Sequence, residues 1–153
     1  MSRVAIVTGG GTGIGAGVAK LFAAQGLNVV LVGRRPGPLD DVRAAIGGRA
    51  HTIAADVGAP DAPARIVEET LATFGRIDVI VNNAAIIQTG RLESFSRGMF
   101  DLARRIPLQR MGEVVDIAAR IWFLVAPESR WTTGNFIHVD GGQVLGLPAA
   151  AGG

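Results

Sequence analysis

The stretch Val4-Ala5-Ile6-Val7-Thr8-Gly9-Gly10-Gly11-Thr12-Gly13-Ile14-Gly15 decides the fold of this chain. Its four leading apolar residues, ended by a glycine-rich turn, are typical of a strand buried on both faces. Apolar residues then recur at helical spacing until Gly26, which predicts a helix over residues 13–25. A buried strand, a glycine loop and a helix in succession predict the first unit of a parallel α/β sheet.

The same alternation of strand and helix continues to about residue 81. It predicts three further strands, at 28–32, 50–55 and 77–81, and two further helices, at 39–46 and 61–74. Residues 33–38 are a loop by composition, because they contain two glycines and two prolines. This pattern indicates a parallel sheet with helices on its faces.

The alternation stops after residue 81. Residues 82–100 carry no convincing strand, and residues 99–106 are at best a short helix. An amphipathic helix is predicted over 113–125 and a last strand over 135–139. We therefore expect one domain over residues 1–145, followed by a flexible tail over 146–153.

Composition bounds the class of protein. Hydrophobic residues make up 48% and charged residues 18% of the 153 positions, which predicts a packed globular domain. No apolar run is long enough for a membrane helix, and the chain starts directly with a strand pattern, so we expect no membrane partner and no targeting segment. The absence of cysteine excludes disulfides and thiolate chemistry and fits the cytoplasm.

The basic isoelectric point of about 10.4 is not a nucleic-acid signal. The formal net charge is only +2, and nearly all basic residues are scattered arginines without interleaved aromatic residues. We therefore expect no nucleic-acid partner. His51 and His138 fall in separate predicted strands with no second ligand nearby in sequence, so we expect no metal site.

The glycine loop has the chemistry of a dinucleotide site. A pyrophosphate needs bare backbone at a helix N-terminus, where amide N–H groups and the helix dipole stabilise its charge. Gly9 allows the tight turn, Gly13 the close approach of the phosphate, and Gly15 the close packing of helix on strand. No Gly-Lys-Ser/Thr follows, which disfavours a nucleoside-triphosphate loop. The alternative is a glycine-rich turn without a ligand.

The spacing Thr-Gly-x-x-x-Gly-Ile-Gly resembles that of the short-chain dehydrogenase/reductase family. Further segments agree with the family in order along the chain. They are Asp56-Val57, Asn82-Asn83-Ala84-Ala85, Arg105-Ile106-Pro107-Leu108, Arg110-Met111-Gly112-Glu113, Trp131-Thr132-Thr133-Gly134 and His138-Val139-Asp140-Gly141-Gly142. The resemblance covers two blocks, residues 1–96 and 98–145.

The resemblance implies a cofactor site at the carboxyl ends of the strands. In the family, an aspartate at the position of Asp56 meets the adenine amino group, and Ala85 replaces a glycine of the family pattern. The implied cofactor-binding residues are Thr8, Gly9, Gly11, Thr12, Gly13, Ile14, Gly15, Arg34, Arg35, Asp56, Val57, Asn83, Ala84 and Ala85. Structural alternatives stay open: Asp56 caps the next helix, Asn83 braces the sheet, and Asp140-Gly141-Gly142 forms a turn and a subunit contact.

The end of the second strand predicts the choice of cofactor. An acidic residue there would bind the ribose hydroxyls of NAD, whereas a positive charge would accept the 2′-phosphate of NADP. This chain has Gly33 at the position of the acid, followed by Arg34 and Arg35. We predict NADP as the preferred cofactor, with NAD as the alternative, since a guanidinium suits a phosphate. The other interpretation is that both arginines point into solvent.

The catalytic residues that the resemblance implies are absent. Reduction of a carbonyl needs a proton donor at the developing alkoxide, which in the family is a tyrosine with a lysine four residues on. The chain contains no tyrosine, its one lysine is Lys20 in the first helix, and its serines match no family motif. No catalytic residue is therefore assigned.

The family pattern jumps between Ser96 and Gly98, as if two helix–strand units of roughly 60 to 100 residues were missing. We expect an abridged doubly wound sheet of about five strands. The family resemblance implies the order third, second, first and fourth, with the last strand next to the fourth. The helix at 61–74 would shield one face nearly alone. Low stability, a homo-oligomer or pairing with a full-length relative would follow.

Three functional hypotheses remain at this point. By resemblance the chain is an NADP-dependent oxidoreductase of alcohol and carbonyl groups, inactive or severely impaired. The second hypothesis is a catalytically dead nucleotide-binding or subunit-pairing module. The third is a deletion product without a function of its own.

Overall fold

The apolar run at the start of the chain forms the central strand β1 (Val4–Thr8), and all five of its residues are buried. The structure is a computed structural model that describes residues 2–85, 103–104 and 106–145. The predicted tail at 146–153 and most of the short helix expected near 99–106 lie outside the described residues.

The first half of the chain alternates strands and helices as predicted, with shifts of a few residues at the element ends. After β1 follow α1 (Gly13–Ala24), β2 (Asn28–Gly33), α2 (Pro36–Ile46), β3 (Ala50–Ala54), α3 (Ala62–Phe74) and β4 (Val79–Val81). Helix α2 begins at Pro36, three residues before the predicted start, because a proline is well suited to the first helical turn. The predicted loop at 33–38 is therefore partly helical.

The four strands form one parallel sheet in the order β3-β2-β1-β4. The register pairs Val4 with Asn28 and Ala5 with Val79, so β1 lies between β2 and β4. This order confirms the abridged doubly wound α/β fold that the sequence predicts. It also brings the carboxyl ends of all four strands to one edge of the sheet.

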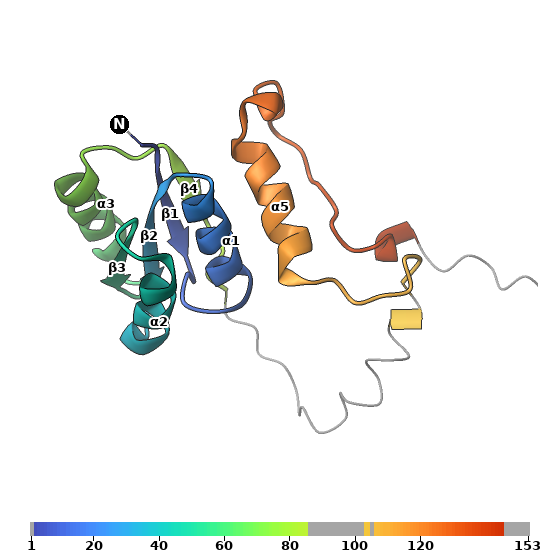
Figure 1. Cartoon of the computed structure of the whole chain (residues 1–153), viewed down its shortest axis with the longest axis horizontal. Coiled ribbons are helices and arrows are strands. Elements are labelled where there is room, and N and C mark those ends of the chain that lie inside the picture. Colours follow the sequence, from blue (N-terminus) through green and yellow to red (C-terminus); the bar gives the residue numbers. More distant parts are fainter. Residues whose placement is uncertain (1, 86–102, 105, 146–153) are drawn as a thin grey trace, which may run out of the picture.

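Two apolar clusters cover the two faces of the sheet. One face packs against α1, α2 and the later helix α5 (Val114–Val125), with Phe22, Leu31 and Leu39 fully buried between the layers. Only α3 covers the other face in the described part of the chain, and it buries Val30 and Ile53 (Figure 1). The expectation that this helix shields its face nearly alone agrees with this packing.

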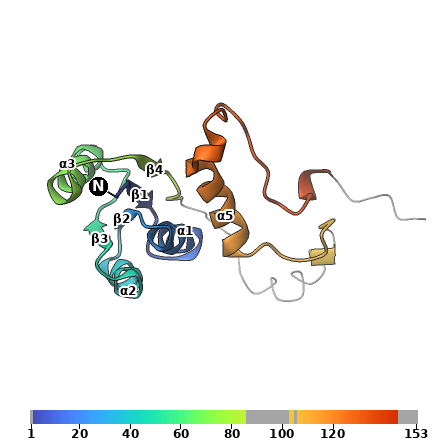
Figure 2. The same ribbon diagram turned by 45° about the horizontal axis from the view of Figure 1, so that its top comes forward.

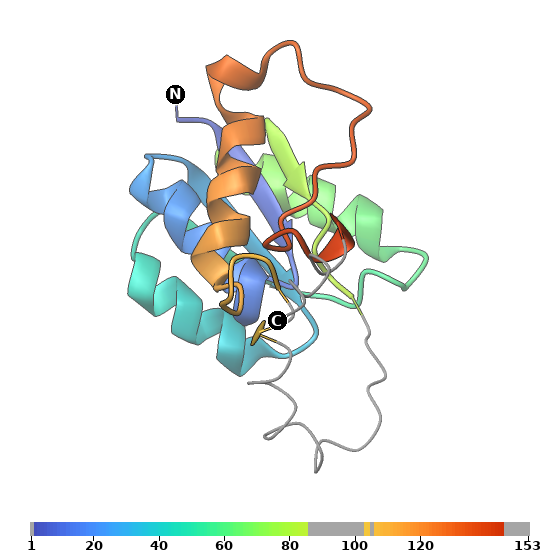
Figure 3. The same ribbon diagram turned by 90° about the vertical axis from the view of Figure 1, so that its right-hand side faces the viewer.

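Helix α5 packs along α1, although it begins 90 positions after α1 ends, at Val114 against Ala24 (Figure 3). Trp122 lies edge-on against Phe22, with 5.7 Å between the ring centroids. The guanidinium of Arg3 donates to the carbonyl of Val125 at 2.9 Å. A Cβ on Gly17 would collide with Val114, so a glycine in α1 lets the two helices approach closely.

The predicted last strand is wrong. Residues 135–139 form no strand, so the described sheet has four strands and not five, and His138 does not lie in a strand. The segment is exposed between two short 3₁₀ helices, η2 (Pro127–Ser129) and η3 (Gln143–Leu145). A strand needs a neighbour for its backbone hydrogen bonds, and this segment lies apart from β4 (Figure 2). No helix in the described residues is long and apolar enough to cross a membrane.

Candidate functional site

The glycine loop between β1 and α1 is held by a side-chain brace to β4. The hydroxyl of Thr8 accepts the backbone N–H groups of Asn83 and Ala84, each at 2.9 Å. The side-chain amide of Asn83 donates back to the carbonyl of Thr8 at 2.9 Å. Asn83 therefore braces the sheet, as one interpretation of the sequence expected, and it does so at the mouth of the loop.

The loop glycines are required by backbone shape and by contact. Gly9 has a φ of +66°, and a Cβ there would stand 2.9 Å from the side-chain amide nitrogen of Asn83. A Cβ on Gly15 would collide with the carbonyl oxygen of Gly9, so only glycine allows this approach of α1 to the loop. Gly13 has a φ of +54° and open space where its Cβ would be.

The first turn of α1 is suited to an anion. Thr12 at the N-cap makes no side-chain capping bond, and the first turn contains no acidic residue. The first amide groups of a helix have no partner within it, and they carry the positive end of the helix dipole. The glycine loop thus presents unneutralised N–H groups next to bare backbone.

Arg34 and Arg35 lie between β2 and α2, both exposed. Neither guanidinium makes an ion pair with another side chain in the described residues. A Cβ at Gly33 would meet only Leu39, at 3.4 Å. The position therefore has room for the Cβ of an acidic residue, although the chain has a glycine there. The end of β2 is therefore positively charged and has no carboxylate.

Asp56 does not cap the next helix. Its carboxylate accepts the N–H of Gly58 at 3.0 Å, while Asp61 is the N-cap of α3. The capping alternative is therefore wrong, and Asp56 instead shapes the turn after β3. The Asp140 segment forms the turn that the sequence indicated, since the Asp140 carboxylate accepts the N–H groups of Gly142 and Val144. These two bonds hold the pKa of Asp140 below its ordinary value.

Most of the predicted site residues surround one cavity of about 450 Å³ at the carboxyl ends of the strands. Ten of the fourteen line it, namely Gly9, Gly11, Thr12, Arg34, Arg35, Asp56, Val57, Asn83, Ala84 and Ala85. Thr8, Gly13, Ile14 and Gly15 do not line it, although they belong to the same loop and helix start. A cavity of this size is typical of a cofactor site.

Sequence reasoning missed five lining residues, which are Gly33, Pro38, Leu39, Ala55 and Gly58. Pro38 and Leu39 reach the cavity because α2 begins early and turns its first residues toward the glycine loop. A Cβ on Gly11 would stand 3.2 Å from that of Pro38. Pro36 was the available signal, since a proline after a loop commonly marks the first turn of a helix.

A second cavity, of about 560 Å³, lies where residues 106–112, α5 and the turn at 139–143 meet. It contains none of the predicted cofactor residues. Two of its charged side chains pair with each other, since Arg110 donates two bonds to Asp116, at 2.7 and 2.8 Å. The Arg110 guanidinium and the N–H of Glu113 hold the pKa of Asp116 well below its ordinary value.

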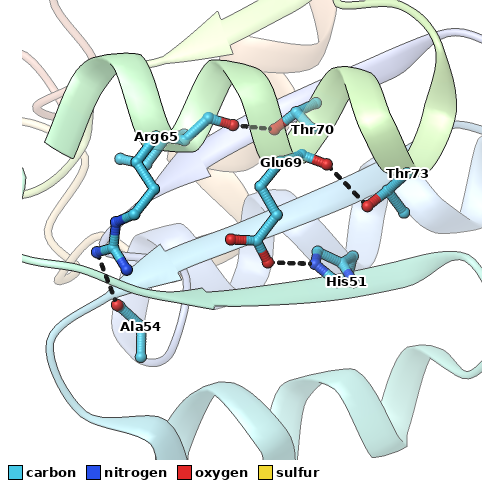
Figure 4. A network of polar contacts seen from close by, with 7 residues as sticks. His51, Ala54, Arg65, Glu69, Thr70 and Thr73 are labelled. Carbon is cyan, nitrogen blue, oxygen red and sulfur yellow. Dashed lines mark hydrogen bonds and ion pairs between the residues drawn. The ribbon is translucent and has the colours of Figure 1, made fainter.

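Polar groups outside the two cavities mostly make structural contacts. His51 makes a 2.9 Å bond to Glu69, which ties α3 to β3 (Figure 4). No group of three or more potential ligands was found in the part of the chain that the structure describes. Lys20 is exposed on α1 and does not line the cavity, and Ser129 is buried with its hydroxyl bonded to Ala126.

Comparison with known proteins identifies the family. The sequence profile described as short chain dehydrogenase matches residues 3–121 of the chain. The chain belongs to this family. It therefore has the NAD(P)-binding Rossmann fold of a family of oxidoreductases, whose members bind a dinucleotide cofactor.

Curated relatives match the chain over different lengths. The 2,5-dichloro-2,5-cyclohexadiene-1,4-diol dehydrogenase of Sphingobium indicum is 33% identical over 95% of this chain and 57% of its own length. A hydroxyphenylmethyl-succinyl-CoA dehydrogenase subunit of Thauera aromatica is 32% identical over 79% of this chain and 56% of its own length. An uncharacterised oxidoreductase of Mycobacterium tuberculosis is 42% identical over 53% and 32%. The chain thus matches little more than half of the length of the first two relatives and about a third of the length of the third.

Solved structures share the fold. A glucose/ribitol dehydrogenase-type short-chain dehydrogenase/reductase from Brucella melitensis matches with a TM-score of 0.86 at 22% identity, over 92% of this chain and 96% of the other. A 3-ketoacyl-(acyl-carrier-protein) reductase from the same organism, complexed with NADH, matches with a TM-score of 0.78 at 23% identity, over 92% and 98%. At these identities the match concerns the fold alone.

Proposed function

We propose that this short-chain dehydrogenase chain binds the adenosine and pyrophosphate half of NADP and does not itself catalyse carbonyl reduction. The observation that carries the proposal is the 450 Å³ cavity, which joins a bare glycine loop to two arginines that have no acidic partner among the described side chains. A bound dinucleotide would supply the nicotinamide ring for hydride transfer.

The lining residues fit the parts of such a ligand. The amides at the start of α1 and the bare backbone at Gly9 and Gly11 suit a pyrophosphate. Arg34 and Arg35 suit a 2′-phosphate, because a guanidinium binds phosphate oxygens with two parallel bonds. Asp56 and Val57 line the cavity at the end of β3, where the family resemblance implies the adenine contact.

The proposed lack of activity rests on composition. A phenol activated by a nearby ammonium group has no counterpart here, because the chain has no tyrosine and its lysine lies exposed on α1, outside the cavity. Without a group that donates a proton to the developing alkoxide, a general acid contribution of about 10²–10⁴ in rate is lost. We infer that turnover is absent or severely impaired.

Calorimetric titration of the purified chain tests the binding half of the proposal. We expect NADP and adenosine 2′,5′-bisphosphate to bind, and nicotinamide mononucleotide to bind far more weakly, since it lacks the adenosine half. Absence of heat with either adenine ligand at millimolar concentration would overturn the binding proposal and leave a deletion product without a function of its own.

Oxidation of NADPH in the presence of a panel of aldehydes and ketones tests the catalytic half. We expect no NADPH oxidation above that of a control without added aldehyde or ketone. Rates comparable with those of intact short-chain dehydrogenases would contradict the missing-acid argument and support the alternative, a working NADP-dependent oxidoreductase.

A further inference from the structure

Only two residues, Arg34 and Arg35, connect strand β2 with helix α2. Strand β2 ends at Gly33, and α2 begins at Pro36. Both arginines line the cavity at the carboxyl ends of the strands. Residues of a short connection take their positions from the elements on either side of it. The placement of the two guanidinium groups therefore depends on how β2 and α2 are held.

The β2 end of this connection is held by backbone hydrogen bonds. The carbonyl of Gly33 accepts the N–H of Ala55, just after β3, at 2.9 Å. The carbonyl of Val32 accepts the N–H of Gly10 at 3.1 Å, which joins the end of β2 to the glycine loop. The arginine pair thus starts from a point that is fixed to two neighbouring segments of the cavity wall.

The α2 end of the connection is held by packing. Leu39 in the first turn of α2 is 1% exposed and belongs to the apolar cluster that also contains residues of α1. A Cβ on Gly11 would stand 3.2 Å from the Cβ of Pro38 and 3.3 Å from the backbone nitrogen of Leu39, closer than an ordinary van der Waals contact. A glycine at this position therefore lets the first turn of α2 lie directly against the glycine loop.

Pro36 restricts the backbone between these two fixed points. The ring of a proline disfavours the helical conformation in the residue before it. Arg35, the N-cap of α2, accordingly has an extended backbone with φ −106° and ψ 113°. Proline also sets its own φ to the value that the first helical position needs. An alanine in place of Pro36 would remove both restrictions, so the backbone of Arg35 could also turn helical and direct its side chain elsewhere.

The prolines in the first turn of α2 also remove helix amides from this end of the cavity. Pro36 and Pro38 have no N–H group, so Gly37 has the one backbone donor among the first three residues of α2. The first turn of α1 contains no proline and keeps all its amide donors. A phosphate group at the start of α2 would therefore depend mainly on the guanidinium groups of Arg34 and Arg35.

We propose that Pro36 is a positioning residue, which holds Arg35 extended and so keeps the two arginines in place for a 2′-phosphate before the ligand binds. This inference rests on the proposed binding of NADP in the same cavity. Pro36 is exposed and is not among the residues that line the cavity, so it acts through the arginines and not by touching the ligand. A subsite that is formed in advance binds more tightly, because less of the chain must become ordered on binding.

Calorimetric titration of Pro36→Ala with NADP and with NAD tests this role. The two dinucleotides differ only in the 2′-phosphate, so the ratio of their affinities isolates the arginine subsite. We expect Pro36→Ala to weaken NADP by about two- to fivefold, the effect of losing one proline's restriction of the backbone, and to leave NAD unchanged. In a chain that already carries Arg34→Ala and Arg35→Ala, Pro36→Ala should have no effect on NADP, since the side chains that it positions are gone.

Pro63→Ala is the matched control, because Pro63 also lies in the first turn of a helix, α3, but outside the cavity. It should leave both affinities unchanged, and thermal unfolding verifies that both variants are folded. Equal weakening of NADP and NAD by Pro36→Ala would show a general disturbance of the cavity and overturn the positioning role. Unchanged affinities in Pro36→Ala would overturn it as well. A natural chain that binds neither dinucleotide would instead contradict the proposed function on which the inference rests.

Discussion

At the residue scale, we propose that the end of β2 sets the preference between NADP and NAD. Gly33 stands where an acid would bind the ribose hydroxyls of NAD, and a Cβ there meets Leu39 at an ordinary 3.4 Å. The sequence alone indicated the missing acid. The structure adds that a side chain can be introduced at this position without rebuilding its surroundings.

Replacing Gly33 by aspartate should therefore reverse the predicted preference. A carboxylate beside the 2′-phosphate would repel it and accept the ribose hydroxyls, so we expect Gly33→Asp to weaken NADP and strengthen NAD by about tenfold each. Arg34→Ala should weaken NADP only. Calorimetric affinities for both dinucleotides measure this, with Arg43→Ala as an exposed arginine control outside the cavity. Unchanged discrimination in Arg34→Ala would mean that this side chain lies in solvent.

Alanine substitutions at two helical glycines, Gly15 and Gly37, test how closely α1 packs against the glycine loop. Gly15→Ala would place a Cβ against the carbonyl of Gly9, whereas Gly37→Ala in α2 meets nothing within 4 Å. We expect Gly15→Ala to destabilise the chain by about 1–3 kcal/mol and Gly37→Ala to stabilise it by roughly 0.5–1 kcal/mol. Urea denaturation measures both. Equal effects of the two substitutions would contradict the close approach of α1 to the loop.

At the element scale, α5 depends on a capping arrangement at its start. The Asp116 carboxylate accepts the backbone N–H of Glu113 at 2.8 Å and pairs with Arg110. Both interactions favour the charged carboxylate, which lowers its pKa in the folded chain. A carboxyl whose pKa is lowered on folding adds stability above its ordinary pKa, and this stability is lost as pH falls below that value.

The docking of α5 should therefore weaken in acid. We expect the natural chain to lose Trp122 packing as the pH falls below about 4, the ordinary pKa of an aspartate. Asp116→Asn should lower the melting temperature by a few degrees at pH 7 and flatten the acid dependence. Tryptophan fluorescence in a Trp131→Phe background reports Trp122 alone, because the chain has two tryptophans. The same acid dependence in both variants would show that Asp116 is not responsible.

Asp78 is a second carboxylate of this kind, and it lies at the amino ends of β1 and β4. It pairs with Arg76 and accepts the N–H of Val4 at 2.8 Å, which lowers its pKa. The start of β1 is thereby tied to the start of β4. Any acid dependence that remains in Asp116→Asn is expected at this strand pair and at the Asp140 turn, whose carboxylate also has a lowered pKa.

At the scale of the whole molecule, one face of the sheet is covered by a single helix in the described residues. Helix α3 buries Ile53 and Ile66, but Ile80 of β4 lies beyond its reach and stays exposed. The buried layer is correspondingly thin on this side. A ligand that binds only the folded chain should then raise its stability measurably.

Saturation with NADP should stabilise the whole chain. At 100 times its dissociation constant, a ligand specific for the folded state adds about 2.7 kcal/mol to the free energy of unfolding. Thermal unfolding with and without NADP measures this shift at a fixed protein concentration, since association also raises the midpoint. Gly15→Ala is the control, because its disturbed loop should reduce the shift. No shift in the natural chain would contradict binding.

The sequence by itself determined the first four strands, the glycine loop and the arginines after β2, while the order of the strands was an expectation from the family resemblance. These features follow from periodicity and from residues whose backbone or charge is special, which act over a few positions. Sequence reasoning also predicted Asn83 both as a brace and as a site residue. Its bonds to Thr8 show the brace, and its place at the cavity lining is where the proposed ligand would contact it.

Only the tertiary structure decided what happens where distant segments must meet. Residues 135–139 have the composition of a strand, yet they form none, because they lie apart from β4 and no described strand stands beside them to pair with their backbone. Pro38 and Leu39 reach the cavity because α2 starts early beside the glycine loop. Strand pairing and cavity walls depend on which surfaces come into contact, and local sequence patterns do not carry that information.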